Sequence, residues 1–139
     1  MNPTALQAAI YAKLNVAAVT APLTAGYGFT AIFNEWVPQV DDAGDPAFFP
    51  FVTFSFPSSV EYDDKDDSGE NSLVQIDVWS RKNTTEVKTI AAAIRAQLHR
   101  QSLAVSGHIT TQVEDMVFER DPDGITRRGR ITVRVLALA

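Results

Sequence analysis

The sequence contains no cysteine and only two histidines among its 139 residues. The missing cysteines exclude disulfides, iron–sulfur clusters, cysteine-bound zinc and a thiol nucleophile. A chain of this length buries about 70% of its unfolded surface, so it does not need such covalent or metal support. We therefore expect a single domain over residues 1–139, with neither a metal nor a cofactor.

Long hydrophobic runs are missing as well. No apolar run approaches the roughly 20 residues that a membrane span needs, and the N-terminus lacks the positive-then-apolar order of a signal peptide. We expect a soluble chain that is made in the cytoplasm and has no membrane partner.

Catalytic motifs are a third absence. The sequence has no Gly-x-Ser-x-Gly turn and no glycine-rich phosphate loop before a predicted helix. His99 and His108 are not spaced as paired ligands on one helix, so we interpret both as surface or rim residues. The chain is predicted not to be an enzyme, and a small hydrolase with an unfamiliar active site is an alternative.

Acidic and basic residues are unevenly distributed along the chain. Residues 1–80 hold 11 acidic and 2 basic side chains, whereas residues 81–139 hold 6 and 10, for a net charge of −5. This acidic balance does not suit nucleic-acid binding by phosphate neutralisation. The asymmetry can instead be neutralised within one fold or between neighbouring copies.

Hydrophobic periodicity predicts the element order α-β-β-β-α-β-β. Capping patterns begin one helix at Thr4 and another after Asn83, and Pro22 is expected to end any continuation of the first. The expected strands cover residues 29–37, 51–56, 73–80, 110–120 and 128–138. This order indicates an α+β fold with a mixed, mainly antiparallel sheet and two main helices packed on one face.

Two connections between strands carry distinctive residues. The sequence Asp121-Pro122-Asp123-Gly124 predicts a type I turn between the last two strands. We expect the neighbouring carboxylate pairs Glu114-Asp115 and Glu119-Asp121 to form salt bridges across that hairpin to Arg127 and Arg128. The connection over 58–71 is strongly acidic and predicts a long hairpin. Its carboxylates are Asp63, Asp64, Asp66, Asp67 and Glu70.

The acidic connection also resembles the start of a calcium-binding loop. Asp64, Asp66, Ser68 and Gly69 match the first positions of that pattern, but Gln75 replaces the bidentate glutamate and strands replace the flanking helices. We interpret the segment as a solvated hairpin tip, and a calcium-dependent binding module is kept as an alternative.

Five of the eight phenylalanines lie within nine residues, at positions 48, 49, 51, 54 and 56. One strand face cannot bury all five. Core packing accounts for Phe54 and Phe56, while Phe48, Phe49 or Phe51 is a candidate for an interface. The alternative is that helices cover both faces of this strand.

Three segments, in this order and spacing, resemble the tail-completion or tail-terminator proteins of long-tailed bacteriophages. They are Val74-Gln75-Ile76-Asp77-Val78-Trp79-Ser80, Ile90-Ala91-Ala92-Ala93-Ile94-Arg95-Ala96-Gln97-Leu98 and Asp121-Pro122-Asp123-Gly124-Ile125-Thr126-Arg127-Arg128-Gly129. Val37-Pro38-Gln39 and Phe49-Pro50-Phe51-Val52 are similar to the extended segment of the same family. The resemblance covers nearly the whole chain. The segment between Val40 and Phe48 departs from it, because this segment is longer and more acidic than is usual in the family.

The resemblance implies a structural α+β subunit that forms a ring, most simply a hexamer, on the last disc of a tail tube. Such a ring stops tube growth and joins the tail to a head-completion or connector protein, while DNA passes through without specific binding. It acts in the virion at the head–tail junction, after assembly in the host cytoplasm. A head-side connector protein is the nearest alternative.

We expect the acidic hairpin and a basic turn to lie on different surfaces of this subunit and to meet complementary partners. The basic turn carries Arg127, Arg128 and Arg130.

Overall fold

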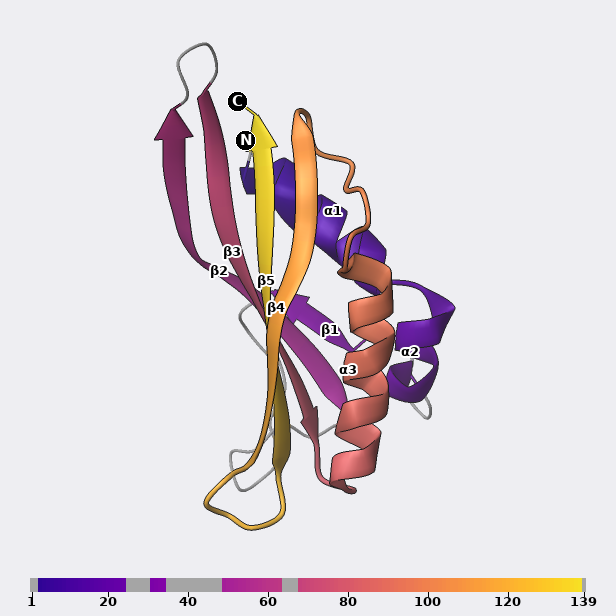
Figure 1. Ribbon diagram of the computed structural model, residues 1–139. Coiled ribbons are helices and arrows are strands. Elements are labelled where there is room, and N and C mark those ends of the chain that lie inside the picture. The colour runs from indigo at the N-terminus through magenta and orange to yellow at the C-terminus, as the bar shows by residue number, and fades with distance from the viewer. Residues whose placement is uncertain (1–2, 25–30, 35–48, 64–67, 139) are drawn as a thin grey trace.

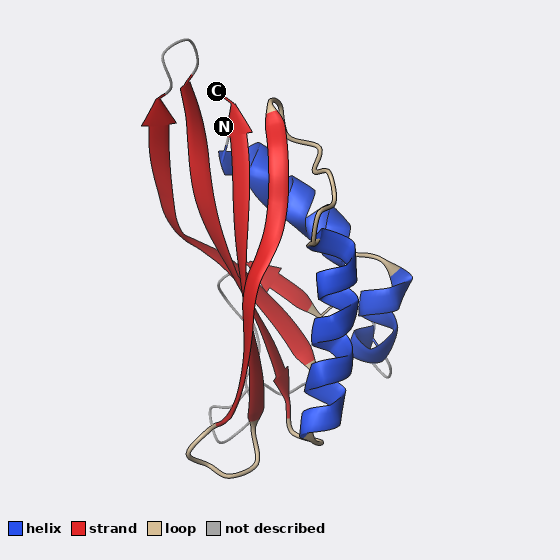
Figure 2. Ribbon diagram, in the orientation of Figure 1, coloured by secondary structure: helices blue, strands red, loops and turns tan. Residues whose placement is uncertain are grey.

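The computed structural model describes residues 3–24, 31–34, 49–63 and 68–138. These residues form three helices and five strands, and the α+β class predicted from the sequence is confirmed (Figure 2). The elements are α1 (Pro3–Leu14), α2 (Ala17–Thr24), β1 (Ile32–Asn34), β2 (Phe51–Asp63), β3 (Ser68–Ser80), α3 (Thr84–Leu98), β4 (His108–Arg120) and β5 (Arg127–Leu138).

The strands form one mixed sheet in the order β1-β2-β3-β5-β4. β1 runs parallel to β2, and every other neighbouring pair is antiparallel. The sheet is therefore mixed and mainly antiparallel, which the sequence predicted. β5, the last strand in the sequence, lies between β3 and β4. The long strands twist along the whole length of the molecule (Figure 1).

The three helices pack on one face of the sheet, and the opposite face carries no described helix (Figure 1). Alternation in β3 directs Val74, Ile76 and Val78 toward the helices, and none of the three is exposed. The apolar stripe of α3 meets them and consists of Val87, Ile90, Ala91, Ile94 and Leu98. Among the described residues, no helix combines the length and the apolar character of a membrane-crossing segment.

The capping signal before α3 is confirmed. Asn83 is the N-cap, and its side-chain oxygen accepts a hydrogen bond from the Glu86 amide at 2.8 Å. The Glu86 side chain accepts a hydrogen bond from the Ser80 hydroxyl at 2.7 Å, so it ties the helix to the end of β3.

Two local predictions were wrong. Pro22 was expected to stop the N-terminal helical region, yet it lies inside α2, where Val19 and Leu23 are completely buried. Burial of these side chains offsets the hydrogen bond that proline cannot donate. β2 was expected to end at Phe56, but a register shift between Ser55 and Ser58 carries the strand past Pro57.

Candidate assembly surfaces

The acidic connection joins β2 and β3 as a long hairpin, as predicted, and the pairing continues to Asp63 and Ser68. Ser68, Gly69 and Gln75 of the calcium-like pattern lie in β3. Glu70 is half-buried and accepts a hydrogen bond from the Ser59 hydroxyl at 3.4 Å. Phe48 and three carboxylates of the predicted site lie outside the described residues: Asp64, Asp66 and Asp67.

The β4–β5 turn is fixed by its own hydrogen bonds. The Gly124 amide donates to the Asp121 carbonyl oxygen at 3.0 Å, and Gly124 adopts a φ of 75°. The Asp123 carboxylate accepts from the amides of Ile125 and Thr126 at 2.8 Å each. It also accepts from the Thr126 hydroxyl at 2.6 Å. These bonds, with the Thr126 hydroxyl contributing most, lower the pKa of Asp123 to about 2.

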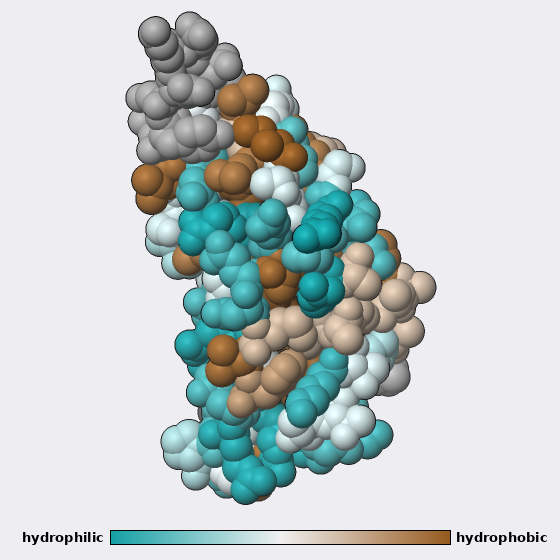
Figure 3. All heavy atoms as spheres, in the orientation of Figure 1, coloured by the Kyte–Doolittle hydropathy of each residue, from teal (hydrophilic) through white to brown (hydrophobic). Residues whose placement is uncertain are grey.

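The hairpin end and the turn end lie at opposite ends of the molecule (Figure 1). Exposed apolar side chains lie at the hairpin end and include Val60, Ile109 and Leu138. On the side seen in Figure 3, hydrophilic residues predominate toward the turn end. At the turn end, Ile125 is an exposed apolar side chain among these hydrophilic residues.

The three arginines of the predicted basic turn have different contacts. The Arg127 guanidinium donates to the carbonyl oxygens of Gly124 and Ile125, so this side chain supports the turn itself. Arg128 and Arg130 form ion pairs with Asp77 on the sheet face opposite the helices, at 3.4 and 3.7 Å.

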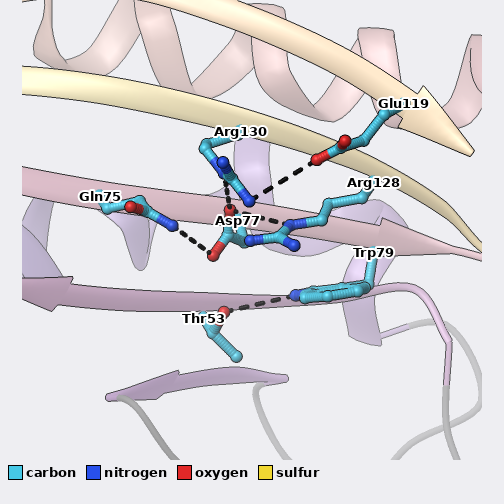
Figure 4. A network of polar contacts seen from close by, with 7 residues as sticks. All are labelled: Thr53, Gln75, Asp77, Trp79, Glu119, Arg128 and Arg130. Atoms are coloured by element: carbon cyan, nitrogen blue, oxygen red, sulfur yellow. Dashed lines mark hydrogen bonds and ion pairs between the residues drawn. The ribbon is translucent and has the colours of Figure 1, made fainter. Parts of the chain in front are cut away.

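Asp77 is the centre of this polar network (Figure 4). Its side chain is 12% exposed and also accepts a hydrogen bond from the side-chain Nε2 of Gln75 at 3.2 Å. Arg130 extends the network to Glu119 of β4 at 3.6 Å. The network therefore joins three strands, β3, β5 and β4, and the sequence alone did not reveal it.

An aromatic cluster lies beside the network on the same sheet face. The Arg128 guanidinium lies 4.7 Å from the centre of the Trp79 ring, which stacks on Phe51 at 5.9 Å. Phe49 contacts Phe51 at 5.1 Å, and Arg81 lies over the Phe49 ring at 4.6 Å. Phe51 is only 3% exposed, so it is a core residue rather than an interface candidate. Phe49 is half-buried against the same core.

The glutamates expected to pair with Arg127 and Arg128 across the last hairpin form ion pairs with other arginines. Glu114 pairs with Arg134, and Glu119 pairs with Arg130. Arg128 is opposite Glu119 in the strand register, but it stacks on Trp79 and pairs with Asp77 instead.

The two histidines take part in hydrogen bonds at strand β4. His99 Nδ1 accepts from the Val113 amide at 3.1 Å, and the His108 ring contacts the Thr111 hydroxyl at 2.7 Å. Burial, with Arg95 and Arg100 nearby, lowers the pKa of His99, and burial lowers the pKa of His108. Within the described ranges, no three histidine or carboxylate side chains are grouped to hold a metal ion.

The described residues form an α+β subunit whose helices lie on one face of a mixed sheet. The chain matches the family model of tail completion protein gp17 over residues 8–137, and it belongs to that family. The family predicted from the sequence resemblance is therefore confirmed. Membership makes the chain a structural component of the bacteriophage tail, within the virion.

Two solved structures share the fold. A chain of the native gene transfer agent virion is 24% identical, with a TM-score of 0.76 over 98% of this chain and 96% of that one. The gp17 protein of bacteriophage SPP1 is 23% identical, with a TM-score of 0.56 over 95% of this chain and 88% of that one. At these identities the likeness shows the fold alone. The comparison with curated protein sequences finds no match.

Proposed function

We propose that this protein forms a closed ring, most simply a hexamer, on the end of the tail tube. The ring stops polymerisation of the tube and joins the tail to the head-completion or connector protein. Family membership alone does not give the position of the protein in the tail. The proposal places the protein at the head–tail junction after its assembly in the host cytoplasm. The observation that carries it is the placement of the β2–β3 hairpin, described up to Asp63 and from Ser68, and of the β4–β5 turn at opposite ends of one subunit.

Such a placement favours head-to-tail association. A closed ring uses heterologous contacts, in which two different surfaces of one subunit meet. The connection over 61–70 contains six acidic residues and one lysine, whereas the turn region over 120–130 contains four arginines and two aspartates. Attraction between these ends gives every contact the same direction around the ring. Acidic residues that face the channel let DNA pass without binding.

The first test is the solution mass of the purified protein, measured by light scattering over a range of concentrations. The measurement is repeated with the tail-tube protein of the same phage. A ring-sized mass alone, or one that appears only with tubes, supports the proposal. A protein that stays monomeric and does not bind tubes under any condition contradicts the proposal and favours a head-side connector.

Charge reversal tests the role of the acidic hairpin. We expect Lys at positions Asp63, Asp64, Asp66 and Asp67 to prevent ring formation or DNA passage, because both ends of the subunit are then basic. A matched control reverses Asp41, Asp42 and Asp45, which belong to another acidic stretch of the sequence. Normal infectious particles from the hairpin variant would rule out this role.

A further inference from the structure

A groove lies between the N-terminal turn of α1 and the β2–β3 hairpin. Its volume is about 290 Å³. Small-molecule pockets usually measure about 300–1,000 Å³, so this groove lies at the lower end of that range and has room for a side chain. The elements that line the groove, the start of α1 and the β2–β3 hairpin, lie toward one end of the molecule, and the β4–β5 turn lies at the other end (Figure 1).

The groove combines an apolar lining with hydroxyls and a carboxylate. Leu6 and Phe56 supply the apolar part. The polar part consists of Thr4, Gln7, Ser58, Ser59, Ser72 and Glu70. This lining suits an aliphatic side chain that is followed by a basic residue, because the apolar part receives the first and the carboxylate attracts the second.

The β4–β5 turn presents that combination. Ile125 is 57% exposed at the turn, and Arg127 follows two residues later. Three bonds to the Asp123 carboxylate and the contacts of Arg127 with two carbonyl oxygens hold the backbone around Ile125. A large apolar side chain on a rigid turn loses little conformational freedom when it binds.

We propose that the β4–β5 turn of one copy docks into the α1–hairpin groove of the next copy, with Ile125 inside the groove and Arg127 near Glu70. This contact rests on the proposed ring and names the two surfaces that form it. It is heterologous, because the groove and the turn are opposite ends of the same subunit. The same contact repeats around the ring.

The absence of cysteine allows a direct test by disulfide trapping. Ser59→Cys and Ile125→Cys are made as separate variants, mixed and oxidised gently. We expect a disulfide-linked dimer of the two variants, identified by mass spectrometry of the joined peptides. Oxidation accumulates even a short-lived contact as a covalent product, so the test does not need a stable ring.

The matched control replaces Ile125→Cys by Ile109→Cys, because Ile109 is 50% exposed at the hairpin end of the molecule. We expect at least tenfold more dimer from the Ser59→Cys and Ile125→Cys mixture than from the control mixture. Equal yields overturn the contact. In the double variant Ser59→Cys/Ile125→Cys, intermolecular disulfides are expected to produce a ladder of linked subunits.

The failure of this contact is distinguishable from failure of the proposed function. If the unmodified protein forms a ring-sized species while Ser59 and Ile125 cross-link no faster than the control, the contact is wrong and the ring remains. If light scattering shows a monomer with and without tubes and cross-linking also equals the control, both proposals are wrong. A second variant, Ile125→Asp, is expected to reduce self-association at least tenfold, whereas Ile109→Asp leaves it unchanged.

Discussion

At the scale of single residues, Asp77 joins strands on the sheet face opposite the described helices. Its carboxylate contacts Arg128 and Arg130, and both arginines are more exposed than the carboxylate itself. Removing the carboxylate leaves two partly buried guanidinium groups without this partner. An unpaired polar group of this kind costs about 1–3 kcal/mol.

We therefore expect Asp77→Ala to lower the free energy of unfolding by about 1–3 kcal/mol, measured by urea denaturation. The control is Glu114→Ala, which removes a more exposed pair with Arg134 and is expected to cost less than about 1 kcal/mol. Equal losses from both variants would show that the network around Asp77 adds nothing beyond a surface ion pair.

Asp123 makes a pH-dependent contribution at the β4–β5 turn. Its pKa is about 2 in the folded protein and higher in the unfolded chain, so its ionised form stabilises the fold. This contribution is complete above the unfolded pKa of about 3.9 and disappears as the pH falls toward 2.

Melting temperatures of the wild type and of Asp123→Ala check this sign. We expect the difference between the two proteins to be largest above pH 5 and to shrink between pH 4 and pH 2. A difference that is constant across this range would mean that the carboxylate charge does not stabilise the turn.

At the scale of elements, Gly129 determines how closely α3 approaches β5. A Cβ at this position would lie 2.7 Å from Val87 Cγ1 and 3.2 Å from the Phe118 ring. We expect Gly129→Ala to cost about 1–3 kcal/mol of stability, because the side chains on both sides must shift. Chemical denaturation measures this loss.

A double-mutant cycle tests the cause of that loss. Val87→Ala removes the closest obstructing atom, so the double variant is expected to lose less stability than the sum of the single variants. Gly124→Ala is the comparison, because its added Cβ meets nothing within 4 Å and its cost comes from the φ of 75°. Additive losses from Gly129→Ala and Val87→Ala would contradict the steric explanation.

Sequence reasoning succeeded for elements whose signals are local. The capping pattern after Asn83 marked the start of α3, and hydrophobic periodicity marked residues 73–80 as a strand. It failed for α2, because burial of Val19 and Leu23 is a tertiary effect that outweighs Pro22. It also shortened β2, because only the strand register reveals the irregularity that accommodates Pro57.

Sequence reasoning likewise found the candidate surfaces whose signals are local and missed the one that depends on strand pairing. The acidic hairpin and the basic turn follow from runs of charge in the sequence. The Asp77 network does not, because its carboxylate and the Arg128 guanidinium are 51 residues apart in the sequence. Their contact depends on β3 pairing with β5, and periodicity within a strand does not specify its neighbour.

At the scale of the whole molecule, the proposed contact between an acidic and a basic end is expected to make assembly sensitive to salt. The Debye length falls from about 8 Å at physiological ionic strength to about 3 Å at 1 M. We expect at least a tenfold loss in the association constant between 0.05 M and 1 M sodium chloride, measured by light scattering. A mass distribution that does not change with salt would mean that apolar contacts alone hold the copies together.

The position of β5 also constrains how the sheet forms during synthesis. β3 and β4 both pair with β5 over most of their length, yet β5 is translated after both of them. Until the ribosome has released β5, β3 has one open edge and β4 lacks its neighbour in the sheet. The β3–β5–β4 portion of the sheet therefore forms only after β5 has been synthesised. At that point one strand supplies the contacts with both β3 and β4.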